Sequence, residues 1–466
     1  MKYLFPVFVL FSLILFSCEK KTNTGDGEVV EIDTTVIGVN TPVNKWIWED
    51  MDLYYLWRNL MPDYAKTNQD PFDYFHSLLY SDRDKWSFLT ENYKDLVNSF
   101  KGIEKATGYS LALYYKDGRH VDVIGIVEFV YPNTPAARAG IKRGDIITKV
   151  NSQVITVNNY LDLLYYTDDQ VLTFSQYQDN SLVELPNTKH IIVEQIVENP
   201  VIKDTIYTIG DKKIGYLMYV GFISDFNSSL NSVFNRFKTG GITDMILDLR
   251  YNPGGDLGAA NYMCSNIAPI SAVTSKSRLV NFNWNSDLQS YFESQGSSNN
   301  LYINMTDTVT NNLNLSKVYV LTTNGTASAS ELTITGLRPY MDVICVGDTT
   351  HGKYVASITV PSTDLTWAMQ PIVIQYSNAN DFTSFYDGLA PDYLVNDSYA
   401  YDIADINDPM ISKAIEVITG ISTKSAILKS SVQPGSEPFN RVGRNPRIQD
   451  GLLNYNNKDV LNSLKY

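Results

Sequence analysis

The stretch Ile242-Thr-Asp-Met-Ile-Leu-Asp-Leu-Arg250 has the pattern of a buried strand, and it runs directly into the turn Tyr251-Asn-Pro-Gly-Gly255. Two glycines after a strand let the backbone approach another group closely or expose its N–H groups. The turn lacks the spacing of a dinucleotide or P-loop motif, so we expect no phosphate site there. Taken alone it is weak evidence of function, because strand-to-helix turns often contain glycine.

Strands and helices alternate on both sides of this segment. This alternation over 190–421 predicts an α/β core of parallel strands covered by helices. The expected elements are a strand over 214–220, a helix over 226–237, a strand over 317–321 and a closing helix over 411–418 after Asp408-Pro409.

Two further turns carry polar residues. The run Thr322-Thr-Asn-Gly-Thr-Ala-Ser-Ala-Ser-Glu331 follows a strand, and a helix is expected to start near Ser330. A hydroxyl at a helix N-terminus suits a nucleophile, because the nearby N–H groups can stabilise an oxyanion. On this cluster alone a plain helix cap remains the alternative. The turn Gly347-Asp-Thr-Thr-His-Gly-Lys353 carries one lysine and by itself indicates a solvated loop.

Short strands and turns occupy 102–185. The run from Tyr131 to Ile155 places Pro135 at a helix start and Gly140 at the helix end, before a strand over 146–150. It closely resembles a PDZ domain of the bacterial protease type. The resemblance implies a peptide edge added to the sheet and a carboxylate-binding loop. That loop would consist of Gly108, Tyr109, Ser110 and Leu111. A small packing domain with an unused groove is the alternative.

The three core motifs together resemble the C-terminal processing (tail-specific) peptidases, which are serine peptidases of the S41 family. The family pattern is a DLRxNxGG turn, an S-A-S-A-S-E segment that holds the serine, and a G-K turn that holds a lysine. Lys353 follows Ser328 by 25 positions, as in the family. The resemblance covers about 43–420. It implies a multidomain α/β protein whose ClpP/crotonase-like layered core carries an inserted PDZ domain and an N-terminal helical region over 42–101.

The resemblance assigns a role to each motif. Ser328 would be the nucleophile and Lys353 its base, and the N–H of Ala329 with one from Gly254 or Gly255 would hold the oxyanion. The residues themselves also support a lysine base, apart from the family resemblance. A serine hydroxyl needs a base, and this chain has only 4 His. A free lysine has a pKa near 10.4, so neutrality at pH 7 costs on the order of 4 kcal/mol, which burial can supply.

The sequence departs from the family at two positions. Pro339 stands where many relatives have Asp, 11 positions after the serine, and Ser357 stands where many have the Gln that orients the lysine amine. Either Ser357 or Gln370 could take over that orienting role. His351, two positions before the lysine, leaves a Ser-His pair open as an alternative.

The N-terminus is expected to be a targeting signal. Residues 1–17 have the basic start and short apolar run of a signal peptide, and the run ends in Leu15-Phe-Ser-Cys18. This resembles the lipobox of bacterial lipoproteins, which implies lipidation of Cys18, a tether over 18–41 and anchoring to a membrane of the cell envelope. An ordinary secretory signal is the alternative. The tail over 422–466 shows little periodicity.

Composition limits the partners. The net charge of −14 argues against nucleic acid, 3 Cys rule out a disulfide scaffold, and 4 His argue against a His-rich metal centre. No cofactor is expected. We therefore predict a lipid-anchored Ser-Lys endopeptidase that acts on proteins with free C-terminal tails, in envelope protein processing or quality control. The alternatives are an inactive peptide-binding scaffold on the same fold and a crotonase-like binder of small molecules. The oligomeric state is not predicted.

Overall fold

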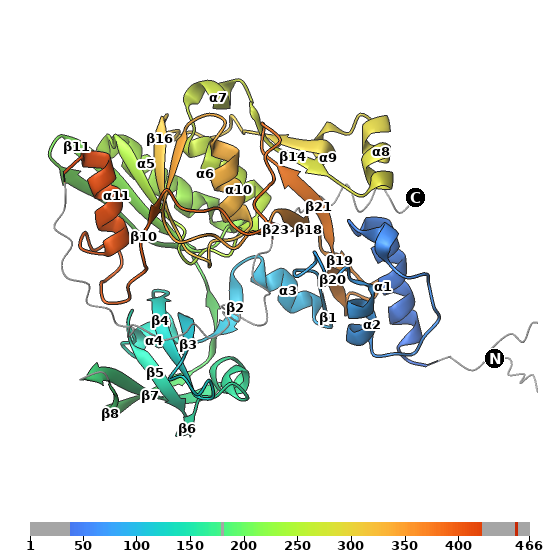
Figure 1. Cartoon of the computed structure of the whole chain (residues 1–466), viewed down its shortest axis with the longest axis horizontal. Helices are drawn as coiled ribbons and strands as arrows, with labels where there is room; N and C mark the ends of the chain where they lie inside the picture. The colour runs from blue at the N-terminus through green and yellow to red at the C-terminus, as the bar shows by residue number, and fades with distance from the viewer. Residues whose placement is uncertain (1–37, 179–180, 422–452, 455–466) are drawn as a thin grey trace, which may run out of the picture.

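The computed structural model describes residues 38–178, 181–421 and 453–454. Figure 1 shows an N-terminal helical region in blue, a small β module in teal and green, and a larger layered core. Asp70 caps the second helix, because its Oδ1 accepts from the backbone N–H of Phe72 at 2.9 Å. The N-terminal elements are α1 (Thr41–Tyr54), η1 (Arg58–Leu60), α2 (Pro71–Leu78), β1 (Phe88–Thr90) and α3 (Tyr93–Ser99).

The N-terminal region is joined to the core by strand pairing and by packing. Strand β1 pairs antiparallel with β20 (Ala368–Gln370), which pairs in turn with β19 (Val360–Pro361). On α1, Ile47 and Met51 are fully buried in the main hydrophobic core of the molecule. The region is therefore held against strands that lie close to the Lys353 turn.

The PDZ-like module is a sheet with the order β3-β4-β5-β7-β8, in which β3 forms an edge. The expected one-turn helix is present as α4 (Pro135–Arg138), and Thr134 caps it. The predicted strand over 146–150 is β5 (Ile146–Val150). The other elements are β3 (Tyr109–Tyr115), β4 (Val123–Val130), β6 (Gln153–Val154), the π-helix η2 (Asp162–Tyr166), β7 (Asp169–Gln178) and β8 (Ser181–Ile192).

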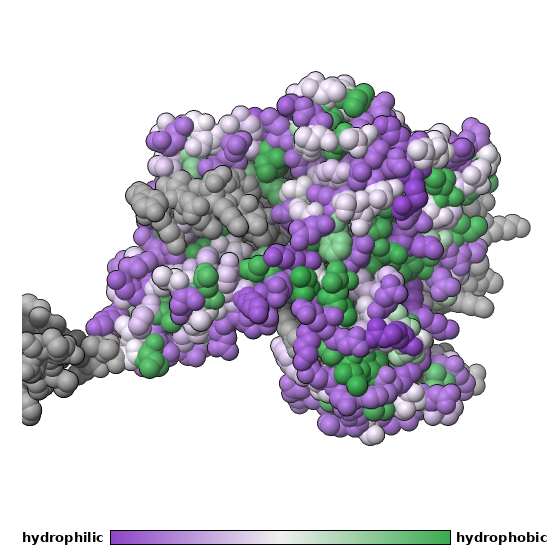
Figure 2. Space-filling model, turned by 180° about the vertical axis from the view of Figure 1, so that it is seen from behind, coloured by the Kyte–Doolittle hydropathy of each residue, from purple (hydrophilic) through white to green (hydrophobic). Residues whose placement is uncertain are grey.

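The module is attached to the core by two strands and by a shared apolar cluster. Strands β2 (Ile103–Ala106) and β9 (Glu194–Val197) pair antiparallel where the chain enters and leaves the module. The Phe129 ring stacks on Tyr251 of the core, with centroids 6.1 Å apart. Seen from behind in Figure 2, the module forms a separate lobe at the bottom of the molecule.

The core is built on a sheet with the order β10-β11-β12-β16-β17-β22. Strands β11 to β22 run parallel, as the alternation of strand and helix predicts, and β10 is antiparallel to β11. Its strands are β10 (Val201–Ile209), β11 (Lys212–Tyr219), β12 (Asp244–Asp248), β16 (Lys317–Thr322), β17 (Asp342–Gly347) and β22 (Tyr393–Leu394). Its helices are η3 (Ser224–Phe226), α5 (Asn227–Gly240), α6 (Leu257–Ile267), α10 (Ala329–Leu337) and α11 (Pro409–Thr419).

A second sheet has the order β13-β23-β18-β21-β14-β15. It contains the end of the Gly-Gly turn and the strand that follows Lys353, so it borders both halves of the predicted site. Its strands are β13 (Gly255–Asp256), β14 (Arg278–Asn283), β15 (Tyr302–Asn304), β18 (Val355–Ser357), β21 (Ile372–Ser377) and β23 (Leu453–Asn454). The helices α7 (Ile270–Thr274), α8 (Ser286–Ser294) and α9 (Ser298–Leu301) complete the core.

Two of the cysteines are buried and free. Cys264 on α6 and Cys345 on β17 form no disulfide. Burial raises the pKa of Cys264 to about 12 and that of Cys345 to about 11, so neither is a reactive thiolate at neutral pH. Cys18 and the predicted signal peptide lie outside the described residues, as does most of the tail. Within the described ranges, every helix is too short or too polar to span a bilayer.

Candidate active site

Ser328 is the residue immediately before α10, and its side chain is completely buried. Its backbone has φ 58° and ψ −109°. A non-glycine residue at such a positive φ carries strain on the order of 1–3 kcal/mol. Within the described residues, Ser328 Oγ makes no hydrogen bond of normal geometry, although it faces the backbone N–H of Glu331 in a capping-box arrangement. A buried, strained serine with an unpaired hydroxyl at a helix N-terminus fits a nucleophile better than a structural cap.

The helix starts one residue earlier than the sequence predicts, at Ala329. Ser330, expected near the start of the helix, lies inside it, and its Oγ donates to the backbone carbonyl of Asn252 at 3.0 Å. This bond ties the serine turn to the Gly-Gly turn. The first N–H groups of a helix lack intrahelical partners, so the backbone N–H of Ala329 suits an oxyanion donor.

The Gly-Gly turn lies directly against Ser328. A Cβ at Gly254 would come 2.8 Å from the Ser328 Cβ, and Gly254 has φ +111°. A Cβ at Gly255 would come 2.2 Å from the Phe222 carbonyl oxygen, so both positions require glycine. The Gly254 N–H already donates to Asn252 Oδ1 at 2.9 Å. Of the two glycine N–H groups predicted for the oxyanion, that of Gly254 is therefore engaged within the turn.

Lys353 is buried, with 1% of its surface exposed, and it lies among aromatic rings. Its Nζ is 5.8 Å from the centre of the Trp86 ring, and that ring also contacts Tyr354 and Tyr386 edge-on. Trp86 comes from the N-terminal region, which therefore forms one wall of the site. Lys353 therefore has the burial that a lysine base requires.

Glu331 connects the serine turn to the lysine turn. It is fully buried on α10, and its Oε2 accepts from the backbone N–H of Ser328 at 2.8 Å and of Lys353 at 2.9 Å. Its Oε1 accepts from Thr350 Oγ1 and from the Gly352 N–H, both at 2.6 Å. Burial raises the pKa of Glu331 to about 7, against the lowering effect of these four hydrogen bonds. One carboxylate thus sets the relative position of the two predicted catalytic residues.

Tyr376 makes a second connection. This residue of β21 is fully buried, and its hydroxyl lies 2.8 Å from the Lys353 carbonyl oxygen and 3.2 Å from that of Ser328. Tyr376 and Trp86 carry no sequence signal for this role, because strand pairing brings them to the site. For Glu331 a signal existed, because Ser-x-x-Glu before a helix is the capping-box pattern.

The candidate lysine-orienting residues are both buried. Ser357 lies on β18, four positions after the lysine. Gln370 lies on β20, where its Nε2 donates to Thr359 Oγ1, and its Oε1 has no hydrogen-bond partner within the described residues. Pro339 lies in the turn between α10 and β17. The orienting role of Ser357 or Gln370 stays a prediction.

His351 is engaged elsewhere. Trp86 Nε1 donates to His351 Nε2 at 3.3 Å. An indole N–H can only donate, so the lone pair of this imidazole nitrogen is occupied by Trp86. The contact argues against the Ser-His alternative. Among the described residues, no three His, Cys, Asp or Glu side chains gather closely enough to hold a metal ion.

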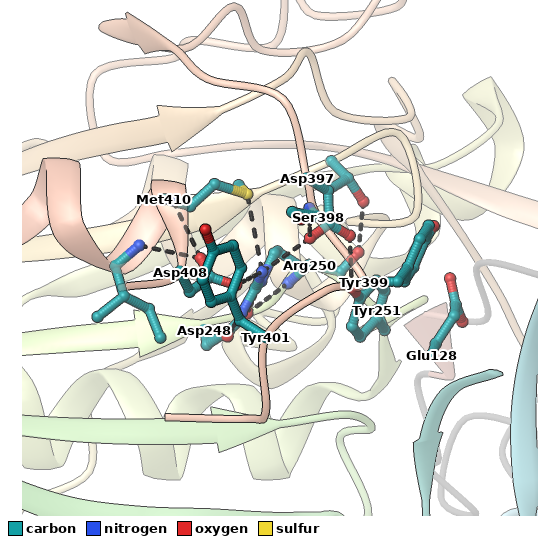
Figure 3. A network of polar contacts seen from close by, with 12 residues as sticks. Glu128, Asp248, Arg250, Tyr251, Asp397, Ser398, Tyr399, Tyr401, Asp408 and Met410 are labelled. Carbon is teal, nitrogen blue, oxygen red and sulfur yellow. Dashed lines mark hydrogen bonds and ion pairs between the residues drawn. The ribbon is translucent and has the colours of Figure 1, made fainter. Parts of the chain in front are cut away.

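A buried ion network surrounds Arg250, which precedes the Gly-Gly turn in the chain (Figure 3). The Arg250 guanidinium pairs with Asp248 at 2.7 Å, Asp397 at 2.8 Å and Asp408 at 2.9 Å. Tyr251 donates to the second oxygen of Asp397. Burial opposes ionisation of Asp397, but Arg250 and Arg143 prevail and lower its pKa to about 2. The network fixes the end of β12 just before the two glycines.

The PDZ-like module reaches the same network. Arg143 of the module pairs with Asp397 at 3.3 Å and donates to the carbonyls of Ser398 at 2.8 Å and Tyr401 at 3.0 Å. Gly144 must be glycine here, because a Cβ would come 2.5 Å from the Tyr399 carbonyl oxygen. Asp397 thus lies between an arginine of the module and the arginine that supports the active-site turn.

The predicted carboxylate-binding loop starts the edge strand β3. Gly108 has φ +90° and lies against the Thr134 side chain. Tyr109 donates to Gln170 Oε1 at 3.2 Å, and Ser110 donates to Glu128 Oε2 at 2.7 Å. Leu111 is buried in the core of the module. The loop is therefore structured at the end of an edge strand, which is where a peptide strand can be added.

Comparisons with known proteins agree with this architecture. Residues 213–395 match the family model of peptidase family S41, residues 42–88 match the peptidase S41 N-terminal domain, and residues 126–174 match a PDZ domain. A carboxy-terminal-processing protease of Bartonella bacilliformis is 24% identical over 280 residues, which are 58% of this chain and 57% of that protein. The chain spans about half the length of the curated relatives it matches.

Two solved structures share the fold. A putative S41 protease from Bacteroides fragilis matches with a TM-score of 0.68 and 27% identity, over 81% of this chain and 98% of that one. A photosystem II D1 C-terminal processing protease matches with a TM-score of 0.51 and 18% identity, over 84% and 99%. The serine and lysine turns of the core lie within the residues that match the model of peptidase family S41, and the parts of the chain before them match that family's N-terminal domain and a PDZ domain.

Proposed function

We propose that this chain is a serine endopeptidase in which Ser328 is the nucleophile and Lys353 the general base. The observation that carries the proposal is the Glu331 carboxylate, which accepts from the backbone N–H of both residues. A strained serine with an unpaired hydroxyl and a buried lysine are held by one side chain. A scaffold that only bound peptides would need neither residue.

The chemistry follows from these groups. Neutral Lys353 takes the proton of Ser328 Oγ as the oxygen bonds to the scissile carbonyl carbon. The resulting oxyanion is stabilised by the backbone N–H of Ala329 and by an N–H of the Gly-Gly turn. Lys353 passes its proton to the leaving amine as the C–N bond breaks. Water then attacks the acyl-enzyme, again deprotonated by Lys353, and Ser328 is released.

The substrates we propose are proteins with free C-terminal tails. The edge strand β3 begins at the loop from Gly108 to Leu111, where backbone N–H groups can bind a chain-terminal carboxylate while the tail pairs with the strand. The Bartonella relative is named a carboxy-terminal-processing protease, which supports the same substrate class. No cofactor or nucleic-acid partner is part of the proposal.

We also propose that the protein works in the cell envelope, anchored by a lipid on Cys18. The support is the apolar run that ends in Leu15-Phe-Ser-Cys18, followed directly by charged residues. Processing or quality control of envelope proteins is the corresponding role. Metabolic labelling with a radioactive fatty acid, compared between the wild type and Cys18→Ser, tests the anchor. Equal labelling of both would contradict it.

The peptidase proposal is tested with an unfolded protein substrate that ends in apolar residues. We expect cleavage by the wild type and a loss of at least about a thousandfold in kcat for Ser328→Ala and Lys353→Ala. Ser290→Ala and Lys66→Ala, at exposed positions, serve as matched controls and should cleave normally. Equal cleavage by all five proteins would exclude the dyad, and no cleavage by the wild type would favour a scaffold.

Tail recognition needs its own substrate pair. The same protein substrate is prepared with a free and with an amidated C-terminus, and the amide removes the charge that the β3 loop would bind. We expect a higher KM for the amidated form. Identical kinetics for the two forms would show that the PDZ domain does not select free tails.

A further inference from the structure

A short strand from the end of the chain lies between the two halves of the active site. Strand β23 pairs in parallel with β13 on one side, with Leu453 opposite Gly255 and Asn454 opposite Asp256. On its other side it pairs in parallel with β18, with Asn454 opposite Ser357. The label β23 in Figure 1 lies next to β18, far in sequence from either neighbour.

Both neighbours of β23 belong to the active site. Strand β13 begins at Gly255, and the preceding Gly254 lies against Ser328. Strand β18 begins two residues after Lys353. In the described sheet these two strands are joined only through β23. The space between the serine side and the lysine side is therefore one strand wide, and main-chain groups of both edges face whatever occupies it.

Such a slot is suited to an extended peptide of any sequence. A peptide that enters it bonds through its main chain to two strands at once, which is recognition by strand addition on both edges. The register also indicates which bond would be attacked. In a parallel pair the two strands run in the same direction. The peptide residue before the one that faces Gly255 therefore lies toward Gly254 and Ser328. The bond before the residue opposite Gly255 is thus the one nearest the nucleophile.

We propose that the slot between β13 and β18 is the substrate-binding site and that Leu453 and Asn454 of the chain itself occupy it at rest. The segment then competes with substrate within one molecule, and substrate must displace it. A tethered competitor has an effective concentration on the order of a millimolar, so weak pairing is enough to raise the apparent KM. The inference deepens the proposed function and depends on it for the role of Ser328.

The first test disrupts the strand in the full chain. Asn454 pairs on both sides, and proline at this position removes its N–H and cannot be accommodated between two strands. We expect Asn454→Pro to lower KM for a protein substrate at least about fivefold at unchanged kcat. Asn440→Pro, in the same terminal segment but outside β23, is the matched control and should keep the wild-type KM.

An unchanged KM in Asn454→Pro would overturn the inference, provided that the wild type shows activity that Ser328→Ala abolishes. Absence of any such activity would instead contradict the proposed function. A binding measurement, which needs no catalysis, then tests the inference independently. It uses a fluorescent synthetic peptide with the sequence of residues 447–459 and a C-terminal amide, which keeps it from the PDZ domain.

The peptide is titrated into full-length Ser328→Ala with and without Asn454→Pro. We expect at least about fivefold tighter binding to the double variant, because the competing segment has been displaced. A peptide that itself carries proline in place of Asn454 should not bind. Equal affinity for the two proteins, or equal binding of the two peptides, would overturn the proposal.

Discussion

Glu331 accepts a hydrogen bond from the backbone N–H of Ser328 at 2.8 Å, and the same oxygen accepts from the N–H of Lys353 at 2.9 Å. Nucleophile and base lie on different turns, after β16 and β17, so nothing in the chain's local geometry fixes their relative position. The shared carboxylate does, and because both contacts are to backbone N–H groups it positions the two turns.

Glu331→Gln should therefore impair both stability and kcat. An amide has one acceptor oxygen, whereas four donors converge on the two carboxylate oxygens. Each donor left unpaired costs about 1–3 kcal/mol. We expect a fall in the free energy of unfolding and a reduction in kcat with little change in KM. Glu293→Gln, on an exposed face of α8, is the control, and a wild-type kcat in Glu331→Gln would exclude the positioning role.

The same carboxylate predicts an opposite pH dependence of stability and activity. Its pKa rises from 4.5 to about 7 on folding, so the folded state holds the extra proton between those values. The stabilisation is complete below about pH 4.5 and is lost as pH rises through 7, on the order of 3 kcal/mol. Activity should rise over the same window, because only the ionised form accepts all four bonds.

The measurement is urea unfolding of the wild type and Glu331→Gln at intervals from pH 4.5 to 8, with substrate assays alongside. The difference in unfolding free energy between the two proteins should shrink as pH rises. A constant difference would show that Glu331 keeps an ordinary pKa in the folded protein.

Substitutions of Ser328 that abolish activity should raise the free energy of unfolding of the protein. Ser328→Ala removes a buried hydroxyl that lacks a partner, which is worth about 1–3 kcal/mol, and Ser328→Gly also relieves a backbone with φ 58°. Both variants should unfold at higher urea than the wild type. Ser330→Ala is the control, and it should lose about 1 kcal/mol because its hydroxyl bonds to Asn252. Destabilisation by Ser328→Ala would mean that the hydroxyl caps the helix.

Gly254→Ala separates steric contact from backbone strain. A methyl group at Gly254 would lie 2.8 Å from the Ser328 Cβ, whereas Gly210 has a positive φ with open space around it. Both alanine variants should lose about 1–3 kcal/mol of stability. Only Gly254→Ala should also lose activity, by roughly a hundredfold or more, because its methyl group would lie 3.0 Å from the Ala329 nitrogen, and displacing that oxyanion donor has such a cost. A similar activity loss in Gly210→Ala would point to a global effect.

The sequence predicted the features that local pattern determines. The core strands over 214–220 and 317–321, the core helices over 226–237 and 411–418 and the short helix at Pro135 follow from period, capping residues and turn residues, and the structure confirms them. Ser328 and Lys353 could be proposed because their motifs and spacing are contiguous in the chain. The domain boundaries and the individual catalytic roles stay predictions.

The supporting residues could not be predicted because topology brings them together. Tyr376 and Trp86 reach the site through β21 and through the pairing of β1 with β20, neither of which leaves a mark near the motifs. The position of β23 depends on one pairing between distant segments. Asp397 gives no sequence signal either, since a loop aspartate looks solvated until Arg250 and Arg143 converge on it.

Asp397→Asn should lower the free energy of unfolding, because Asp397 pairs with both Arg250 and Arg143. Its pKa falls from 3.8 to about 2 on folding because the two arginines outweigh burial, so it stabilises the protein above pH 3.8 and the effect is lost as pH falls through 2. Asp397→Asn should lose about 3–5 kcal/mol at pH 7, because it leaves buried charge uncompensated. The loss should diminish as pH falls from 3.8 through 2, because the folded wild type becomes protonated at Asp397 only near pH 2.

Asp117→Asn is the matched control for this charge. Asp117 also has its pKa lowered to about 2 by an arginine, but it lies on the surface, where solvent screens the pair. We expect little change in its unfolding curve. If Asp397→Asn behaves like Asp117→Asn, the network contributes no net stability. If instead the PDZ domain alone becomes sensitive to protease, Asp397 serves chiefly to hold Arg143, and the Arg250 turn keeps its place through Asp248 and Asp408.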